Sequence, residues 1–366
     1  MIICIPFSNM DDYHWKRYLD QFKAISDNCD GLFIPVIRGF YPQSYDGLNV
    51  DMVIYKDLEK AKEKPRRYGV VPRLIRSSLL ALYSIYIFND FAKTCSRHPY
   101  DVVLGYSGSG GMEYFHTLLG KHKGAPVVHR MRGYGKLERK YLKTLGSNII
   151  GEYLDDYAWR TYDRHIPINE SYYTIIRDFG VNPEKIARPI GLGVDTGMFY
   201  PKSYPSKMTV GYIGRLSVEK STEFLVKLME RTPDLDYVVV GKKIVEFDPP
   251  GNCAYYGPVL KDRVNDYYNK VNAVILPSLS EGVSNIIYET YATGRLLVCS
   301  PQAIPPEYPV YGAKLDLNID DWVNYLYSLT PEYCYEVGQK AIQWAHGNRW
   351  ADFGARIAGE CRRLLV

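Results

Sequence analysis

Short apolar segments alternate with helical patterns through the second half of the chain. Apolar segments at residues 208–213, 235–240 and 273–276 alternate with helical spacing of apolar residues at about 218–231, 261–271 and 285–293. Short apolar segments bounded by turns are typical of buried parallel strands, and their alternation with helices is typical of α/β domains. The pattern predicts a doubly wound parallel sheet in this half of the chain.

The first half shows the same pattern in a looser form. Its apolar segments, which we interpret as strands, are residues 2–6, 32–37, 102–105 and 126–129. In a doubly wound sheet, ligands bind at the carboxyl ends of such strands. We therefore expect a second α/β domain in this half.

The chain divides near residues 200–206, where proline and polar residues separate the two halves as a linker would. With 366 residues, the chain is long enough to form two hydrophobic cores. We expect one Rossmann-like domain at residues 1–202 and another at residues 203–345. The amphipathic segment at residues 346–366 is expected to be a helix.

Two carboxylates flank a helix start after the apolar segment 273–276. Helical spacing begins near Asn285 and stops at Gly294, so Glu281 lies in the preceding turn and Glu289 about one turn inside the helix. The first backbone N–H groups of a helix have no partner within it, and they form a site for an anion such as phosphate. The residues expected to form this site are Gly282, Val283, Ser284, Asn285 and Ile286.

Two cations lie near another predicted helix start. The sequence GYIGRLSVEK at residues 211–220 gives a strand end, a turn at Gly214, and then Arg215 and Lys220. Cations are disfavoured at the positive end of a helix dipole unless an anion binds there, which argues against plain surface charge. A planar guanidinium and a mobile ammonium can together neutralise an anion such as a phosphate without a metal.

These segments resemble the retaining glycosyltransferases of the GT-B fold, in particular glycosyltransferase family 4. Seven residues separate Glu281 from Glu289, as in the E-x7-E signature of that family, and residues 211–220 are similar to its G-x-x-G-R-L-x-x-E-K element. Ser221 stands where the family usually has glycine. The resemblance extends through residues 100–366 and is looser before them. It implies two Rossmann-like domains that face a central cleft, with the acceptor domain at residues 1–202 and the donor domain at residues 203–345. It also implies that the helix at residues 346–366 crosses back to the first domain.

The resemblance also implies an activity and a role for each residue. A sugar would pass from a UDP-, GDP- or ADP-sugar to a glycan or lipid-linked acceptor, with retention at the anomeric carbon. Arg215 and Lys220 would stabilise the departing diphosphate, Glu281 would position the transferred sugar, and Glu289 would bind the ribose hydroxyls. Gly214 and the helix start at residues 282–286 would complete the donor site. Two alternatives remain open: a nucleotide-sugar epimerase of the same fold and a non-catalytic GT-B partner subunit.

No metal and no other cofactor is expected. Asp234 and Asp236 form a D-x-D triplet, but the triplet merely leads into an apolar strand. The sequence shows no convincing metal-ligand cluster, and Arg215 and Lys220 already supply the charge that a divalent ion would bring. We therefore expect metal-independent transfer.

The sequence differs from the family after the predicted strand at residues 126–129. The family usually has a histidine near the reacting sugar at this strand end, and by alignment that position holds Arg132. Alternation along a strand puts Arg130 and Arg132 on one face and His129 on the other. We expect Arg132, with His129 and Ser109, to line the cleft of the first domain, where Arg132 would hold a donor phosphate or an acidic acceptor. A surface arginine at a strand end is the alternative.

Composition bears on the cellular location. Seven scattered cysteines without a C-x-x-C pair favour reduced thiols in a cytosol over a disulfide scaffold or a structural zinc site. The first residues lack the features of a signal peptide, and the longest apolar run, residues 79–88, is about half of a bilayer span. We expect a cytoplasmic protein without a nucleic-acid partner.

Basic residues gather in the first half, although the net charge is only +4. They are Lys62, Lys64, Arg66, Arg67, Arg73 and Arg76 before the apolar run, and Lys121, Lys123, Arg130, Arg132, Lys136, Arg139, Lys140 and Lys143 after it. Basic residues beside apolar ones suit an anionic membrane surface. The pattern predicts peripheral docking on the inner face of the membrane and a lipid-linked acceptor. A buried helix at residues 79–88 with solvated basic residues explains the pattern equally well.

Overall fold

The computed structural model describes residues 1–10, 12–39, 48–55, 85–106, 112–132 and 149–365. The chain forms two compact units. The first unit comprises Met1–Ile168, Tyr172–Ile190 and Phe353–Val366, and the second comprises Asn169–Ser171 and Gly191–Asp352. The main boundary therefore lies at residues 190 and 191, whereas the sequence pattern placed it at residues 202 and 203.

The first unit is built on a parallel sheet. Its strand order is β2-β3-β1-β5-β6-β7, and β4 pairs with the first part of β3. The strands are β1 (Ile2–Cys4), β2 (Phe7–Met10), β3 (Gly31–Gly39), β4 (Val50–Ile54), β5 (Val102–Tyr106), β6 (Val127–Met131) and β7 (Arg164–Pro167). The four apolar segments predicted as strands correspond to β1, β3, β5 and β6.

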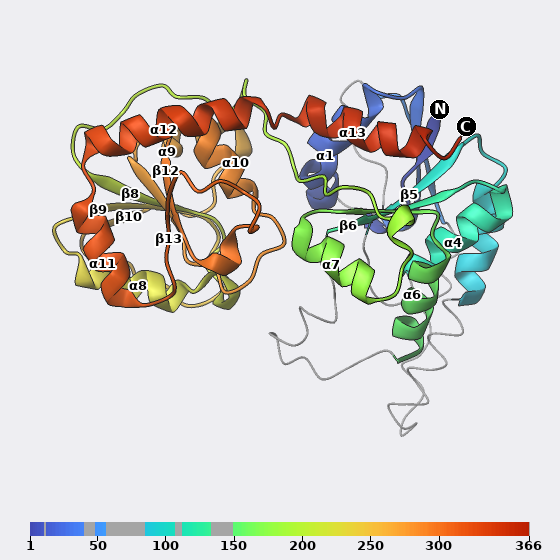
Figure 1. The fold of residues 1–366 in the computed structure, drawn as a ribbon, viewed down its shortest axis with the longest axis horizontal. Coiled ribbons are helices and arrows are strands. Elements are labelled where there is room, and N and C mark those ends of the chain that lie inside the picture. The colour runs from blue at the N-terminus through green and yellow to red at the C-terminus, as the bar shows by residue number, and fades with distance from the viewer. Residues whose placement is uncertain (11, 40–47, 56–84, 107–111, 133–148, 366) are drawn as a thin grey trace. The chain divides into compact units, whose positions relative to one another are not determined.

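Helices cover both faces of this sheet. The helices are α1 (Asp12–Ser26), α4 (Met112–Lys123), α6 (Ile149–Thr161), α7 (Glu170–Asp178) and α13 (Trp350–Arg362), with a further helix at residues 85–95 and a 3-10 turn, η1 (Pro183–Lys185). Figure 1 shows α1 and α13 on one face of the sheet and α4 and α6 on the other. A side chain at Gly354 of α13 would collide with the backbone of Ala24 in α1, so these two helices touch.

The second unit is also a parallel sheet between two layers of helices. Its strand order is β10-β9-β8-β11-β12-β13. The strands are β8 (Thr209–Ile213), β9 (Asp236–Val240), β10 (Cys253–Tyr255), β11 (Ala273–Leu276), β12 (Leu296–Cys299) and β13 (Gly312–Lys314). All four residues of β11 are completely buried, as expected for a central strand covered on both faces.

Five helices cover the second sheet. They are α8 (Thr222–Arg231), α9 (Val264–Tyr268), α10 (Asn285–Ala292), α11 (Ile319–Ser328) and α12 (Pro331–His346), with the 3-10 turns η2 (Val218–Lys220), η3 (Lys261–Arg263) and η4 (Pro301–Ala303). The helices α8 and α11 lie on one face, and α9, α10 and α12 lie on the other (Figure 1). The predicted fold class, two doubly wound α/β domains, is confirmed.

The strand order of the second unit determines where a ligand can bind. From β8 the chain moves outward through β9 to β10 on one side, and then returns to β11 on the other side of β8. Ligands of doubly wound sheets bind at the carboxyl ends of two neighbouring strands where the chain changes direction in this way. In this unit those strands are β8 and β11.

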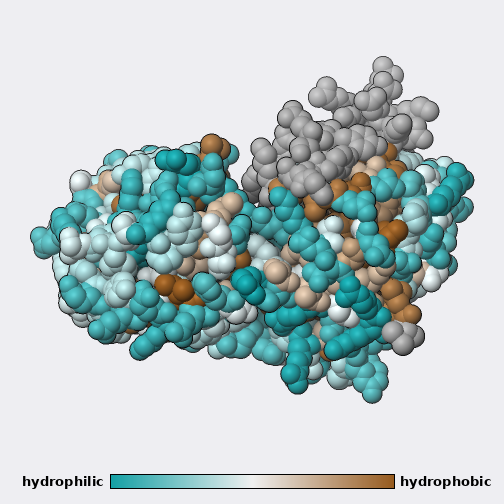
Figure 2. All heavy atoms as spheres, turned by 90° about the horizontal axis from the view of Figure 1, so that it is seen from above, coloured by the Kyte–Doolittle hydropathy of each residue, from teal (hydrophilic) through white to brown (hydrophobic). Residues whose placement is uncertain are grey.

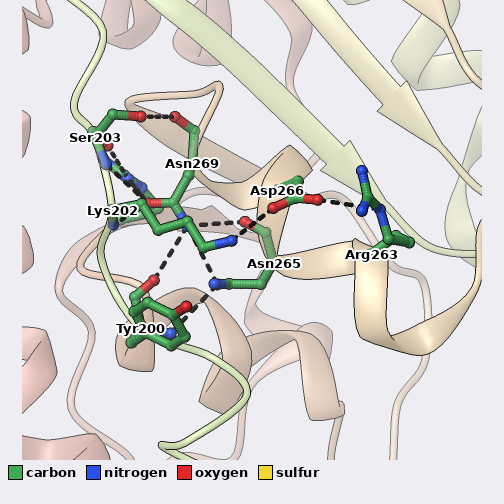
Figure 3. A network of polar contacts seen from close by, with 8 residues as sticks. Tyr200, Lys202, Ser203, Arg263, Asn265, Asp266 and Asn269 are labelled. Carbon is green, nitrogen blue, oxygen red and sulfur yellow. Dashed lines mark hydrogen bonds and ion pairs between the residues drawn. The ribbon is translucent and has the colours of Figure 1, made fainter.

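The segment predicted as a linker is fastened to the second unit (Figure 3). Asn269, which follows α9, accepts hydrogen bonds from the backbone N–H groups of Lys202 (2.6 Å) and Ser203 (3.4 Å). Its side-chain amide donates to the backbone oxygen of Tyr200 (3.1 Å). Arg295, completely buried, donates to Oδ1 of Asn269 (2.7 Å) and to the backbone oxygen of Ser203. These residues are a fixed part of the second unit, so their interpretation as a linker is wrong.

Among the described residues, no helix is long and apolar enough to cross a bilayer. On the face shown in Figure 2, apolar side chains of the second unit are scattered among hydrophilic ones. The described end of the apolar run at residues 79–88 belongs to the core, because Ile87 and Phe88 are buried against the first sheet. For these two residues the structure agrees with the buried-helix interpretation.

Candidate active site

The turn after β8 is shaped by two glycines. Gly214 has a φ of 155° and its N–H donates to the backbone oxygen of Val240 (2.8 Å). Gly241, after the neighbouring strand β9, has a φ of 148°, and any side chain there would collide with the backbone oxygen of Gly214. Only glycine allows this approach. The two backbones therefore meet and direct the next residue, Arg215, to the carboxyl edge of the sheet.

Arg215 is exposed at this edge. Its side chain is 59% exposed, and Nη2 lies 3.4 Å from Oε1 of Glu219. An exposed ion pair of this length contributes little to stability, at most about 1 kcal/mol. The guanidinium can therefore leave Glu219 for a phosphate at small cost.

Lys220 ends the turn η2 and is mostly buried. Its Nζ contacts Oε1 of Glu281, which is also mostly buried. The next residue, Ser221, has a left-handed backbone with φ 54° and ψ 48°. Glycine is favoured in this conformation, which explains why the resembling family usually has glycine at this position.

Burial changes the acidity of this lysine. Removal from water lowers the pKa of Lys220 to about 8, Arg215 acts in the same direction, and Glu219 opposes them. The Glu281 carboxylate, in direct contact, also favours the ammonium form. Removing one partner of a buried ion pair leaves a buried charge without compensation, which is strongly unfavourable. An anionic ligand would give the ammonium a second counter-charge.

The loop after β11 is tied to the turn η2. The N–H of Leu279 donates to the backbone oxygen of Glu219 (2.9 Å), which brings Glu281 to Lys220. Gly282 accepts a hydrogen bond at its backbone oxygen from Nδ2 of Asn169 (2.8 Å). The two turns and the segment at residues 169–171 therefore form one connected structure.

Helix α10 starts beside the β8 turn. Ser284 is its N-cap residue and is buried, and Asn285 is exposed. The side chain of Ile286 approaches the α-carbon of Gly214 closely enough that a side chain on that glycine would meet it at 3.2 Å. The backbone N–H groups of the first turn of α10 thus lie at the same edge as the β8 turn, where they can bind an anion.

Glu289 is held by a different residue. Its side chain is half-buried in α10, and Oε2 accepts a hydrogen bond from the hydroxyl of Tyr268 (2.9 Å). Tyr268 is completely buried in α9. Burial and, after it, the charge of Glu289 raise the pKa of Tyr268 well above its usual range. The phenol therefore stays protonated and donates a hydrogen bond to the carboxylate.

In the first unit, the alternation predicted along β6 is observed. The Arg130 guanidinium lies over the Phe353 ring of α13 (5.5 Å), and the Arg132 guanidinium lies over the Tyr18 ring of α1 (5.0 Å). His129 packs on the opposite face against Trp159 of α6. Arg130 is completely buried and donates to the backbone oxygen of Pro167 (3.1 Å), so it does not belong to a basic surface.

His129 lies in the interior and not at a cleft, which corrects the sequence prediction. Its side chain is completely buried, with Nδ1 3.0 Å from Nδ1 of His165 and Nε2 3.7 Å from the carboxylate of Glu113. Burial lowers the pKa of His129 well below its usual range, so the ring is neutral. Arg132 is half-buried at the end of β6, and Ser109 lies outside the described residues.

Three residues beside the predicted site were not predicted. Asn169 holds the loop at Gly282, Tyr268 holds Glu289, and Ser278 donates to Oε1 of Glu281 (3.1 Å). The position of Ser278, in the polar turn that begins after the apolar strand β11 and Pro277, is a usable signal for this residue. Asn169 and Tyr268 give no such signal, because only the folded chain brings them to their partners.

In the part of the chain that the structure describes, no group of three or more histidine, cysteine, aspartate or glutamate residues could hold a metal ion. Asp236 of the D-x-D triplet lies at the amino end of β9, away from the edge with Lys220, and pairs with Lys207 (2.6 Å). Each of the seven cysteines is a free thiol.

Comparisons with known proteins agree with this architecture. Residues 207–318 match the family model described as "Glycosyl transferases group 1". No curated protein sequence matches the chain. The sucrose-phosphate synthase from Thermosynechococcus elongatus has a similar structure, with a TM-score of 0.72, 15% identity, and coverage of 100% of this chain and 99% of that one.

Two further solved structures are similar. HepE from Anabaena in complex with UDP and glucose has a TM-score of 0.71 and 13% identity, and all of both chains is covered. WaaG, a glycosyltransferase involved in lipopolysaccharide biosynthesis, has a TM-score of 0.66 and 10% identity, with 97% of this chain and 98% of that one covered. The family match spans Arg215, Lys220, Glu281 and Glu289. The chain therefore has the GT-B fold, and its second unit carries a domain that matches the glycosyl transferases group 1 family.

Proposed function

We propose that this protein is a retaining glycosyltransferase of the family 4 type, which transfers a sugar from a nucleotide-sugar donor to an acceptor without a metal. The observation that carries the proposal is the contact of Lys220 with Glu281 between the turns that follow β8 and β11. A cation and a carboxylate from the two resemblance motifs meet there, beside the exposed Arg215 and the start of α10. The match of residues 207–318 to glycosyl transferases group 1 supports the same activity.

The proposed roles follow from the charge that develops during transfer. When the sugar leaves, negative charge accumulates on the diphosphate, and preorganised positive groups stabilise it. Arg215, Lys220 and the first N–H groups of α10 supply this positive charge. Glu281 positions the transferred sugar, and Glu289 binds the ribose hydroxyls of the donor.

Uridine diphosphate sugars are the first donors to test. HepE has been solved in complex with UDP and glucose and with UDP-glucose, and it shares the fold of this chain. GDP- and ADP-sugars are the alternatives, because the groups described above bind the diphosphate, the sugar and the ribose, which all these donors share.

The acceptor is proposed to be a glycan or a lipid-linked glycan, reached from an anionic membrane surface. Three residues of the pattern that suggested membrane docking, Arg130, Ile87 and Phe88, are buried and cannot contact a membrane. Most of the remaining basic residues lie outside the described part of the chain. Co-sedimentation with anionic liposomes tests the idea: binding should fade with salt and weaken when Arg66, Arg67 and Arg73 become glutamate. A protein that stays in the supernatant at low salt would point to an acceptor in solution.

A donor screen tests the function itself. UDP, GDP and ADP are first compared for thermal stabilisation of the protein, since a ligand that binds only the folded state raises its melting temperature. The sugar donors of the stabilising nucleotide are then incubated with and without glycan acceptors, and the anomeric configuration of donor and product is read by NMR. Transfer with retention is the expected result. Conversion of the donor without an acceptor would indicate an epimerase, and the absence of any nucleotide effect would overturn the proposal.

A further inference from the structure

Each of the two carboxylates in the site accepts a hydrogen bond from a buried hydroxyl group. The Ser278 hydroxyl donates to Oε1 of Glu281 (3.1 Å), and the Tyr268 hydroxyl donates to Oε2 of Glu289 (2.9 Å). The side chains of Ser278 and Tyr268 are completely buried. A glutamate side chain has three rotatable bonds, so such a donor restricts where its carboxylate can point.

The backbone on both sides of Ser278 is fixed. Ser278 lies two residues after the end of β11, and its carbonyl oxygen accepts a hydrogen bond from the hydroxyl of Ser300, which follows the neighbouring strand β12. The N–H of Ser300 in turn donates to the backbone oxygen of Leu276 (3.1 Å). The Ser278 hydroxyl is thus held by the central strands of the sheet.

Two groups contact the same oxygen of Glu281. The ammonium of Lys220 and the hydroxyl of Ser278 both contact Oε1 of this carboxylate. These two contacts restrict the direction in which the carboxylate can point. A hydrogen bond from Ser278 therefore acts on the orientation of the group that is proposed to position the sugar.

Tyr268 acts on the other carboxylate from a separate element. It lies in α9, on the same face of the sheet as α10, and its hydroxyl reaches the side chain of Glu289 one turn into α10. The buried phenol stays protonated and donates a hydrogen bond to Glu289. Rotation of the Glu289 carboxylate away from this direction would cost the hydrogen bond.

We propose that Ser278 and Tyr268 are positioning residues with separate tasks: Ser278 orients Glu281 toward the transferred sugar, and Tyr268 orients Glu289 toward the ribose. The inference rests on the proposed function. It goes beyond that function by assigning two residues outside the resemblance motifs and by requiring different kinetic effects. Correct orientation of the sugar stabilises the transition state more than the ground state, whereas contacts to the ribose stabilise both states equally.

The test compares Ser278→Ala and Tyr268→Phe in steady-state kinetics. Ser278→Ala should lower kcat roughly tenfold and leave the donor KM within about twofold, as expected for one lost hydrogen bond to a charged group. Tyr268→Phe should raise the donor KM roughly tenfold and leave kcat within about twofold. Ser278→Thr retains a hydroxyl and should recover most of the lost kcat.

Matched controls separate positioning from loss of a buried hydroxyl. Tyr291→Phe removes a phenol of α10 that donates to the backbone of Pro309, and Thr232→Val removes a buried hydroxyl that donates to the backbone of Leu228. Both controls should keep wild-type kcat and KM. Each variant is also checked for its melting temperature, so that loss of folded protein is not counted as lost kcat.

The outcomes distinguish the inference from the proposed function. If the wild type transfers sugar but the two variants change kcat and KM together, or behave like their controls, the positioning roles are wrong and the function stands. If the wild type binds UDP without transfer, titration with UDP still tests one half: Tyr268→Phe should weaken binding and Tyr291→Phe should not. If the wild type binds no nucleotide, both the function and the inference are overturned.

Discussion

Lys220 and Glu281 touch although they come from different turns, one after β8 and one after β11. The contact exists because β8 and β11 are neighbours in the sheet, and because Leu279 donates to the backbone of Glu219. Lys220 is mostly buried, whereas Arg215 is exposed. The two cations should therefore respond differently to substitution.

Arg215→Ala should lower kcat about a hundredfold, because one group that stabilises the leaving diphosphate is lost. Its melting temperature should stay near the wild-type value, since the exposed pair with Glu219 contributes little. Lys220→Ala should lower kcat at least as much and also lower the melting temperature, because Glu281 loses its buried partner. Kinetics and thermal unfolding check both variants. Near-normal kcat in both would show that these cations do not act on the leaving group.

Nucleotide binding should weaken at alkaline pH. The pKa of Lys220 is lowered to about 8 by burial, and Glu281 opposes this change, so the ammonium loses its proton above pH 8 but below the usual lysine range. Diphosphate charge is constant there, because phosphate groups titrate near pH 6. The Kd for UDP should rise by up to about tenfold per pH unit above the pKa.

Titration calorimetry between pH 7 and 10 checks the pH dependence. Lys220→Arg is the matched control, because arginine stays charged over this range. Its Kd should be nearly constant with pH. A wild-type curve parallel to that of Lys220→Arg would mean that the Lys220 ammonium does not contact the ligand.

Glu289→Ala should mainly raise the donor KM, with a small effect on kcat. Contacts to ribose hydroxyls are equally present in the ground state and the transition state, so their loss weakens binding without changing the chemical step. Initial rates over a range of donor concentrations give the two constants. An unchanged donor KM would contradict the role of Glu289.

Activity should survive excess EDTA. In the proposed function, Arg215, Lys220 and the start of α10 stabilise the charge on the diphosphate, so a divalent ion is not needed for this purpose. Rates before and after dialysis against EDTA, with Mg²⁺ or Mn²⁺ added back, make the comparison. If activity is lost and either ion restores it, then a divalent ion, and not these protein groups alone, supplies the positive charge that stabilises the diphosphate.

Asn269→Ala should destabilise the second unit by about 3 kcal/mol. The substitution leaves the N–H of Lys202, the buried Arg295 and the carbonyl of Tyr200 without their partner, and each unsatisfied group costs about 1–3 kcal/mol. Urea unfolding gives the free energy. Lys227→Ala is the control, because it removes only an exposed ion pair and should change stability little. Asn252→Ala is less suitable, because the Asn252 side chain also donates to three backbone carbonyls.

The strands were predictable where apolar residues are continuous, as at β11. Strand β4 (Val50–Ile54) was not predicted, since polar Asp51 interrupts it and its role is to pair with one edge of β3. Period-two alternation correctly separated His129 from Arg130 and Arg132. The burial of Arg130 could not be inferred, because its partner Phe353 comes from the other end of the chain.

The same limit applies to the site. Sequence motifs identified Lys220 and Glu281 separately, and the strand order brings them into contact. Local spacing carries no information about which strands become neighbours. For that reason Asn169 and Tyr268, which lie 113 and 21 residues from their partners Gly282 and Glu289, could be found only in the folded chain.

Helix α13 has a consequence for synthesis of the protein. Phe353 covers the buried Arg130, Gly354 packs against Ala24, and Glu360 pairs with Arg164 (2.8 Å), so residues near the end of the chain complete a unit that residue 1 begins. Domains generally fold as they leave the ribosome, the amino-terminal one first. In this chain the second unit is completed before the first. When the ribosome reaches residue 352, all residues of the second unit have been made, but the first unit still lacks the part of its core that α13 supplies. A ribosome that stalls before residue 353 would therefore hold a chain whose earliest segment is still incomplete.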